Sequence, residues 1–402
     1  MKIFYISGAL LPSEISHSLS IMRVCQAFVD CGHEVLLSGR AAQGEDRDPV
    51  AFYGLRGGFR VIVNRLSRLT DNPVSRRLFL PGFALAWRTR REFASFKPEI
   101  VYSRLTLAEL AFVPRDVPIV YEMHSLGPLR RSWRHRWLFF WLLRQKRFRR
   151  IVVTTDGLAE MLREEMAGVE IVVARLSAEL PVAVSDEQLT EFRKAELSGG
   201  NFRSHVGYTG NLDTFGLRGT EIICAAAARM PDVAFHVVGG KQDAVEHWKR
   251  YAARVGATRN LFFYGHRNPS QMPYFLNCFD VVLAPLQSKK SAEAPTGMGM
   301  SPLKLPQYLS YGKPIVASDI PAHREILVHE KTALMVRASD VDAWVAAIRK
   351  LLADKGLCQR LGEEGRLAYE RGFSPKVRVE RILAGLTPPG AADLPEHRAA
   401  GR

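Results

Sequence analysis

Short apolar runs alternate with longer amphipathic segments along almost the whole chain. The short runs are rich in β-branched and aromatic residues, which is typical of strands. The longer segments, such as residues 21–33 and 341–356, repeat their apolar residues at helical spacing. This alternation predicts parallel sheets covered by helices. The predicted strands cover residues 2–7, 34–39, 60–64, 99–103, 118–123, 151–155 and 170–174 in the first half, and 205–210, 233–240, 261–265, 280–285, 314–318 and 333–336 in the second.

Two such sheets are expected, because 402 residues exceed what one hydrophobic core usually organises. A polar stretch near residues 182–202, with Gly199 and Gly200 before a new strand, indicates the linker. The predicted fold class is α/β, with two doubly wound, Rossmann-like parallel-sheet domains that face each other across a cleft at the carboxyl ends of their strands. The expected parts are a first domain over 1–185 joined by a C-terminal helix over 374–387, a second domain over 200–373, and a flexible tail over 388–402.

Composition narrows the class of protein further. The chain is 47% hydrophobic and 24% charged, which is typical of globular proteins. Its five cysteines are scattered, without a C-x-x-C pair or a histidine cluster at metal-ligand spacing, so neither a disulfide framework nor a zinc site is expected, and a reducing cytoplasm fits best. The sequence shows neither a signal peptide nor a run approaching the roughly 20 apolar residues of a membrane-spanning helix.

The formal charge of +15 is concentrated in one segment. Residues 51–150 contain 21 Lys and Arg against 6 Asp and Glu, whereas the other 302 residues contain 35 of each. Such a segment favours an anionic partner, either a membrane or a nucleic acid. Within it, residues 130–150 place arginines around a Trp/Phe/Leu stripe, and residues 76–93 repeat this composition.

Two basic aromatic helices favour an anionic membrane surface as the partner. The alternatives are that the apolar face of each helix belongs to the core, or that the arginines bind nucleic acid, which we rank lower because no nucleic-acid-binding module is recognisable. The residues expected at the membrane are Arg130, Arg131, Trp133, Arg134, Trp137, Trp141 and Arg144.

Two loops of the second half carry candidate phosphate-binding groups. The stretch "VGYTGNLDTFGLRGTEII" runs from a strand through four glycines into a helix that starts near Thr220, with Arg218 directly before it. Glycines allow close approach of backbone to phosphate, and a helix N-terminus attracts anions. Tight turns would explain this loop equally well if it stood alone, but "APTGMGMSPLKLPQYLSYGKPIVASD" adds a second cation, Lys304, at another junction before a helix. A nucleotide diphosphate needs two or three such positive partners.

In this order, the motifs resemble those of GT-B glycosyltransferases of family 4, which are retaining and nucleotide-sugar-dependent. The resemblance rests on "MKIFYIS", "GHEV", "YEMHS", "GYTGN", "PDVAFHVVGG", "DVVLAPL", "SPLKLPQYLSYGKPIVASD" and "REILVHEKTALMV", and it covers nearly the whole chain. The family's paired glutamates are replaced here by Gly299 and Gln307, and its first glycine-rich turn by Ser16 and His17. The donor-binding residues that the resemblance implies are Ser16, His17, Gly210, Asn211, Gly219, Gly299, Met300, Ser301, Leu303 and Gln307.

The catalytic residues that the resemblance implies are His124, Arg218 and Lys304. His124 follows a strand and is expected to donate to a sugar hydroxyl or a developing charge, unless it merely bonds a loop carbonyl. Glu122 is expected on the other face of that strand, and Glu325 is expected to open a helix, both in structural roles. A front-face transfer, in which the leaving diphosphate accepts the acceptor's proton, would need no metal, and the sequence has no D-x-D motif in a suitable place.

The expected function is therefore transfer of a sugar from a nucleotide-diphosphate donor to a lipid-linked or growing glycan acceptor, with retention of configuration, in cell-envelope polysaccharide or lipopolysaccharide synthesis. No cofactor beyond the donor substrate is expected, and the expected location is cytoplasmic, at the inner face of the plasma membrane. Two alternatives stay open. The lost glutamates suggest a non-catalytic subunit that scaffolds a partner enzyme. A Rossmann oxidoreductase is disfavoured because no G-x-G-x-x-G follows the first strand.

Overall fold

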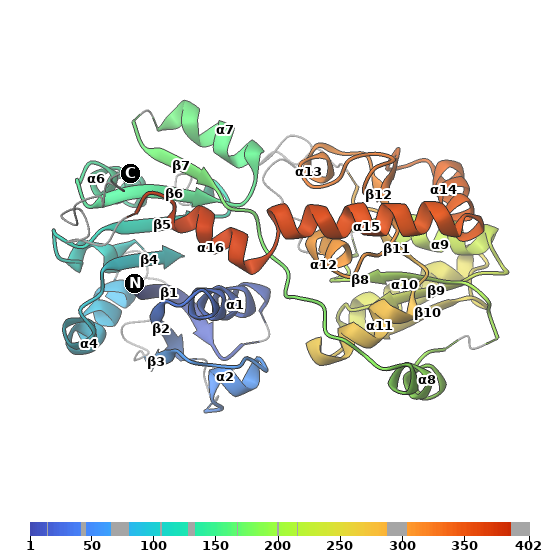
Figure 1. Ribbon diagram of the computed structural model, residues 1–402, viewed down its shortest axis with the longest axis horizontal. Helices are drawn as coiled ribbons and strands as arrows, with labels where there is room; N and C mark the ends of the chain where they lie inside the picture. The colour runs from blue at the N-terminus through green and yellow to red at the C-terminus, as the bar shows by residue number, and fades with distance from the viewer. Residues whose placement is uncertain are drawn as a thin grey trace, which may run out of the picture. The chain divides into compact units, whose positions relative to one another are not determined.

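The computed structural model describes residues 1–13, 15–41, 46–65, 80–104, 107–127, 133–166, 168–198, 201–214, 216–287 and 304–386. The chain divides into two compact units (Figure 1). Unit 1 comprises Met1–Ala174 and the segment that begins at Val379, and unit 2 comprises Arg175–Arg378.

Unit 1 contains a seven-stranded parallel sheet in the order β3-β2-β1-β4-β5-β6-β7. Along each strand, alternate residues enter two different cores, as the two-residue period of a strand requires. Tyr5 and Tyr102 pack with α1 and α16, whereas Phe4 and Tyr121 pack with α4, α6 and α7. The elements are β1 (Lys2–Leu11), α1 (Ser16–Asp30), β2 (Glu34–Ala41), α2 (Pro49–Phe52), β3 (Arg60–Asn64), α4 (Leu80–Phe96), β4 (Ile100–Arg104), η1 (Ala108–Phe112), β5 (Ile119–Met123), α6 (Trp133–Leu143), β6 (Phe148–Val153), α7 (Asp156–Glu165), β7 (Glu170–Val173) and the part of α16 (Pro375–Leu383) from Val379 onward.

Unit 2 contains a six-stranded parallel sheet in the order β10-β9-β8-β11-β12-β13 (Figure 1). Helices α9, α10 and α14 cover one face, and α8, α11, α12 and α15 cover the other. The elements are α8 (Asp186–Ala195), β8 (His205–Thr209), α9 (Thr220–Arg229), β9 (Ala234–Val238), α10 (Gln242–Arg254), β10 (Leu261–Gly265), η2 (Pro269–Gln271), α11 (Met272–Cys278), β11 (Val281–Ala284), α12 (Lys304–Ser310), β12 (Ile315–Ser318), α13 (Pro321–Arg324), β13 (Leu334–Val336), α14 (Val341–Ala353) and α15 (Lys355–Gly372).

The predicted fold class is confirmed, because both sheets are parallel, doubly wound and covered by helices on both faces. The order of the strands reverses between β1 and β4 in unit 1, and between β8 and β11 in unit 2. In open α/β sheets such a switch point is where ligands bind, at the carboxyl ends of the strands. The two switch points therefore mark the places to look for functional side chains.

The stretch expected to be a linker contains a helix. Ser185 begins α8 with a capping box, in which its hydroxyl accepts from the backbone of Gln188 and the Gln188 side chain accepts from the backbone of Ser185. Phe192 then stacks on Tyr274 and meets Phe275 edge-on, so α8 packs onto α11. Its polar residues form the exposed face of this helix, and the chain passes between the units at Ala174 and Arg175 instead.

At the C-terminal end of the chain, Val379 and Ile382 of α16 lie buried in the core of unit 1. Arg150 of β6 donates from Nη1 to the carbonyl of Ile382 over 3.1 Å. The segment predicted as a tail, residues 388–402, lies outside the described residues.

Candidate functional site

The switch point of unit 2 gathers the loop after β8 and the start of α12. Gly210 follows β8 with φ +145°, and a Cβ there would lie 3.3 Å from Nζ of Lys304. Gly219, the N-cap of α9, has φ +70°, and a Cβ there would lie 1.6 Å from the carbonyl oxygen of Pro285. Only glycine fits at Gly219, so this loop lies directly against the chain that leaves β11.

Lys304 and Arg218, the two cations predicted from separate loops, lie at this same site. The ammonium of Lys304 lies over the ring of Tyr208, 3.6 Å from its centroid. Burial, and then the charge of Arg218, hold the pKa of Lys304 well below its usual value. Arg218 is half-buried, and its Nε lies 3.7 Å from Oδ2 of Asp213. The site thus brings the cations Lys304 and Arg218 together, with Asp213 beside Arg218, which suits it to an anionic ligand.

His323 on α13 is a member of this site that the sequence analysis missed. Its Nδ1 donates to the carbonyl of Ser318 at the end of β12, over 2.9 Å. Burial, with a further contribution from the charge of Lys304, lowers the pKa of His323 to about 4, so the ring is neutral. Its place in the short helix that follows the carboxyl end of β12 was the available signal.

Three other predicted features of unit 2 have different outcomes. Gln307 is half-buried on α12, one turn after Lys304, and its contact with the donor stays a prediction. Asn211 is exposed, and its carbonyl accepts from the hydroxyl of Tyr208 over 3.0 Å. The expectation that Glu325 opens a helix is wrong, because Glu325 is the C-cap of α13, where a negative charge is not favoured by the helix dipole.

Several predicted residues lie outside the described part of the chain. The donor-binding residues Gly299, Met300, Ser301 and Leu303 lie outside the described residues, as do Arg130 and Arg131 of the expected membrane segment. Ser16 begins α1, and the placement of its side chain is not described.

The switch point of unit 1 holds a hydrogen-bonded network around His124. Arg104, at the end of β4, donates from Nη2 to Nδ1 of His124 over 3.1 Å. Glu122 of β5 is hydrogen-bonded through Oε1 to Nε2 of His124, and its Oε2 accepts from the hydroxyl of Tyr102. Because a guanidinium can only donate, Nδ1 of His124 is an acceptor, and Nε2 carries the proton that is shared with Glu122. Both ring nitrogens of His124 are therefore engaged by the protein.

This network corrects one expectation. Glu122 was expected on the opposite face of its strand from His124, yet the two side chains are hydrogen-bonded. The physical reason is the two-residue period of a strand, which places residues 122 and 124 on the same side. Glu122 and Arg104 are thus members of the candidate site that the sequence analysis missed, and the E-x-H spacing was the available signal.

His17 lies beside this network. It belongs to the first turn of α1, and burial, followed by the charge of Arg104, lowers the pKa of its imidazole. Arg104 also donates from Nη1 to Oγ of Ser20 on α1, over 3.3 Å. The start of α1 and the ends of β4 and β5 therefore meet at one site, where His17 was predicted to lie near phosphate.

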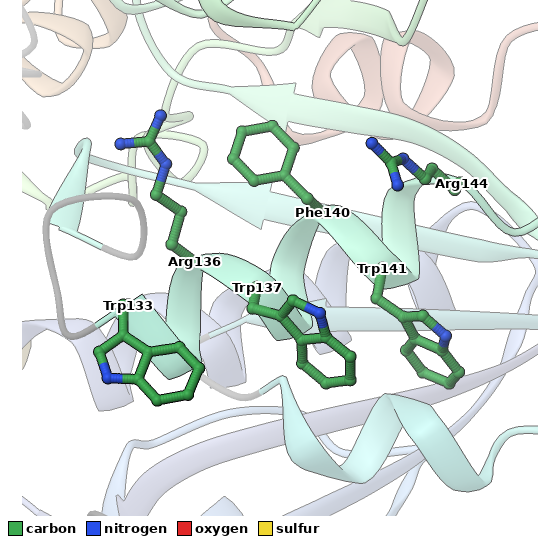
Figure 2. A pocket seen from close by; sticks show the side chains of 6 residues that line it. All are labelled: Trp133, Arg136, Trp137, Phe140, Trp141 and Arg144. Atoms are coloured by element: carbon green, nitrogen blue, oxygen red, sulfur yellow. The ribbon is translucent and has the colours of Figure 1, made fainter.

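A second candidate surface is formed by α6. Leu138, Phe139 and Leu142 are buried in the core of unit 1. Trp133, Trp137 and Trp141 are instead 73%, 62% and 42% exposed, and Trp137 and Trp141 are stacked with ring centroids 6.4 Å apart. Figure 2 shows these three indoles along one side of the helix, beside a second row in which Phe140 lies between two arginines. The helix thus has one face in the core and a separate aromatic face outside it. Its open groove is lined by Trp133, Arg136, Trp137, Phe140, Trp141 and Arg144.

Helix α4, which like α6 contacts η1, presents similar groups. Trp87 is 67% exposed, and the guanidinium of Arg90 lies over its ring, 3.6 Å from the centroid. Phe83 of α4 meets Phe112 of η1 edge-on, and both rings are exposed. Among the described residues, Arg134 and Arg136 of α6 and Arg144, directly after this helix, form no ion pair. We call these exposed residues the aromatic-basic face. It consists of Phe83, Trp87 and Arg90 of α4, Phe112 of η1, Trp133, Arg134, Arg136, Trp137 and Trp141 of α6, and Arg144.

Two kinds of feature are absent from the described part of the chain. It contains no helix long and apolar enough to cross a membrane. Nor does it contain a group of three or more His, Cys, Asp or Glu residues that would hold a metal ion.

Comparison with known proteins gives matches over both units. The family model described as "Glycosyltransferase Family 4" matches residues 18–174, and the one described as "Glycosyl transferases group 1" matches residues 203–354. A curated relative, the GDP-mannose-dependent alpha-(1-6)-phosphatidylinositol monomannoside mannosyltransferase of Mycolicibacterium smegmatis, is 28% identical over 34% of this chain and 35% of its own length. The chain spans 35% to 40% of the length of the curated relatives that it matches.

Solved structures resemble nearly the whole chain. A glycosyltransferase from Rickettsia africae superposes with a TM-score of 0.72 at 13% identity, covering 96% of this chain and 99% of that one. The Anabaena protein Alr3699/HepE, solved in complex with UDP and glucose, superposes with a TM-score of 0.68 at 17% identity, covering 96% of this chain and 100% of that one. At these identities the likeness establishes the fold alone.

Proposed function

We propose, from the premise that this chain belongs to the GT-B glycosyltransferases of the family 4 type, that it transfers a sugar from a nucleotide-diphosphate donor with retention of configuration. The observation that carries this proposal is the joint placement of Lys304 and Arg218 at the switch point of unit 2. A pyrophosphate bound there would meet two cations, the N-terminus of α9 and a glycine backbone that permits close approach.

The same cations suit the chemical step. As the bond from sugar to phosphate breaks, negative charge grows on the leaving diphosphate, and Lys304 and Arg218 are placed to stabilise it. We propose a front-face transfer in which the diphosphate takes the proton of the attacking acceptor hydroxyl. These two side chains would supply the charge stabilisation, so the transfer is proposed to need neither a metal nor a cofactor.

The acceptor is proposed to bind at unit 1, near His124, while His17 stays a proposed donor-binding residue. The engagement of both nitrogens of His124 favours a role within the network of Arg104 and Glu122 over free donation to a sugar hydroxyl. We propose a lipid-linked or growing glycan acceptor in cell-envelope polysaccharide or lipopolysaccharide synthesis. In support, the mycobacterial relative is named for a phosphatidylinositol mannoside, and a similar structure belongs to a lipopolysaccharide outer core galactosyltransferase.

The aromatic-basic face is proposed to rest on an anionic membrane at its cytoplasmic side. Indole rings favour the headgroup region, and arginines without acidic partners favour anionic lipid. A lipid-linked acceptor would be presented at that same surface.

Binding and turnover measurements on two variants test the proposed donor site. Replacing Lys304→Ala or Arg218→Ala is expected to lower turnover of a nucleotide sugar by about a hundredfold each, as the loss of a charge-stabilising donor does. Calorimetry with UDP and GDP should show weaker binding for both variants. Arg229→Ala, which removes an exposed cation paired with Asp342, is the matched control.

Near-normal turnover in both variants would reject the assignment of these cations. A wild-type chain that binds neither diphosphate and hydrolyses no nucleotide sugar would favour the alternative, a non-catalytic subunit that scaffolds a partner enzyme.

A further inference from the structure

Tyr208 holds the ammonium of Lys304 in a confined position. The ring is fully buried on β8, and Nζ of Lys304 lies 3.6 Å from its centroid. The hydroxyl of Tyr208 donates to the carbonyl of Asn211 over 3.0 Å, which fixes the orientation of the ring. Gly210 closes another side, since a Cβ there would lie 3.3 Å from Nζ.

Lys304 contacts a neutral partner, the ring of Tyr208, whereas Arg218 lies beside a carboxylate. Among the described residues, no carboxylate lies within ion-pair distance of Lys304, whereas Arg218 has Asp213 at 3.7 Å. Burial raises the pKa of Tyr208, so its phenol stays protonated. The ring face therefore attracts the ammonium through its quadrupole without adding a negative charge.

A carboxylate in the place of this ring would weaken the binding of an anionic ligand by Lys304. It would neutralise Lys304 and would compete with an incoming anion for the same N–H donors. An aromatic face compensates part of the ammonium's lost hydration and leaves its charge available to the ligand.

We propose that Tyr208 is a positioning residue whose π face orients the ammonium of Lys304 for the pyrophosphate of the donor. The inference rests on the proposed function, in which Lys304 and Arg218 bind that pyrophosphate. It assigns a role to the ring of Tyr208 that is separate from its hydroxyl and from its volume in the core.

Stepwise fluorination of the ring tests this role without changing its size appreciably. Tyr208 is replaced by Phe and then by mono-, di- and trifluorinated Phe, and the dissociation constants of UDP and GDP are measured by calorimetry in the full-length protein. Phe keeps the π face, so binding should stay within about threefold of wild type. Each added fluorine makes the electrostatic potential of the ring face less negative. The dissociation constants should therefore rise progressively, by about tenfold at three fluorines.

Two controls separate this effect from stability and from direct contact with the ligand. Phe235 is fully buried in the same core on the neighbouring strand β9, and fluorinating it should leave both dissociation constants unchanged. In a Lys304→Ala background, the series at Tyr208 should be flat, because the ring would have lost the cation on which it acts.

The role of Tyr208 would be overturned if the dissociation constants of UDP and GDP did not change with fluorination in the otherwise wild-type protein. It would also be overturned if fluorination weakened binding equally in the Lys304→Ala background. These results differ from failure of the proposed donor site, in which Lys304→Ala and Arg218→Ala would themselves bind UDP and GDP as the wild type does.

Discussion

At the scale of single residues, the network around His124 makes a sharp prediction. Glu122→Gln keeps the shape of the side chain but replaces a charge-assisted hydrogen bond to Nε2 of His124 with a weaker neutral one. Turnover is expected to fall about tenfold, since a hydrogen bond to a charged group contributes roughly 1.5 to 3 kcal/mol. Nitrogen chemical shifts of the imidazole should show the Nε2-protonated form of His124 in wild type and a mixture of forms in the variant.

Glu160→Gln, an exposed glutamate on α7, is the matched control for that experiment. Unchanged turnover in Glu122→Gln together with an unchanged histidine spectrum would show that the carboxylate does not hold the ring.

The residues that could be predicted from the sequence are marked by local patterns, whereas contacts between residues far apart in the chain are not. Arg218 stands in the glycine-rich loop before α9 and Lys304 stands at the start of α12, after a second glycine-rich stretch, so pattern alone located them. The pairing of Lys304 with Tyr208 joins residues 96 positions apart, as their numbers show, and no local periodicity encodes such a contact. The partnership of Glu122 with His124 was within reach, because strand alternation by itself places both on one side.

At the scale of elements, α6 shows why periodicity left two interpretations open. Helical spacing predicted an aromatic stripe but not whether the core or the surface receives it. The core takes Leu138, Phe139 and Leu142, so the indoles remain outside (Figure 2).

This exposed arrangement predicts binding to anionic vesicles. Replacing Arg90, Arg134, Arg136 and Arg144 of the aromatic-basic face by Gln should weaken vesicle association by roughly a hundredfold or more, since each cation near such a surface contributes about 1 kcal/mol. Co-sedimentation with vesicles containing phosphatidylglycerol measures it, and activity on a soluble acceptor should persist. The control removes four exposed cations from unit 2: Lys249, Arg250, Arg254 and Arg259.

Equal vesicle binding by the variant and the wild type would contradict the membrane proposal. Tight binding of the wild type to duplex DNA in place of vesicles would favour nucleic acid as the partner of the arginines.

The sheet of unit 2 contains a pair of histidines that should make the stability of the fold depend on pH. His205 and His236, on adjacent strands, share a hydrogen bond of 3.0 Å between Nδ1 and Nε2, and Nδ1 of His236 lies 2.9 Å from the hydroxyl of Tyr264. Burial, and then the charge of His205, lower the pKa of His236 to about 3. Burial also lowers the pKa of His205, against the opposing charge of nearby Asp280.

Because the folded pKa of His236 lies below the unfolded value, the unfolded chain takes up the proton first. Stability is therefore full above about pH 6.5 and is lost as the pH falls toward 3. For one such group the free energy of unfolding should fall by roughly 3 kcal/mol between pH 7 and pH 4. Urea unfolding across this range measures it, and His236→Phe should flatten the pH dependence; an equally steep dependence in that variant would assign the acid sensitivity elsewhere.

At the scale of the whole molecule, the two units carry different charges and different chemistry. The excess of cations over residues 51–150 falls entirely within unit 1, together with the aromatic-basic face and the network of His124. Unit 2 carries the pair of Lys304 and Arg218 at its switch point. The alternation of strands and helices predicted both sheets. Buried parallel strands are short apolar runs, and the amphipathic helices between them can be recognised from local sequence. The helix α8 was missed because few of its residues are apolar and none of them is fully buried, so its sequence shows little helical periodicity.

The most direct measurement is a crystal structure of the full-length protein with a nucleoside diphosphate bound, with UDP and GDP tried in parallel. Oxygens of the pyrophosphate are predicted within hydrogen-bonding distance of both Nζ of Lys304 and the guanidinium of Arg218, with Lys304 still over the ring of Tyr208. A diphosphate that binds elsewhere, or one that leaves both cations without contact, would contradict the proposed donor site.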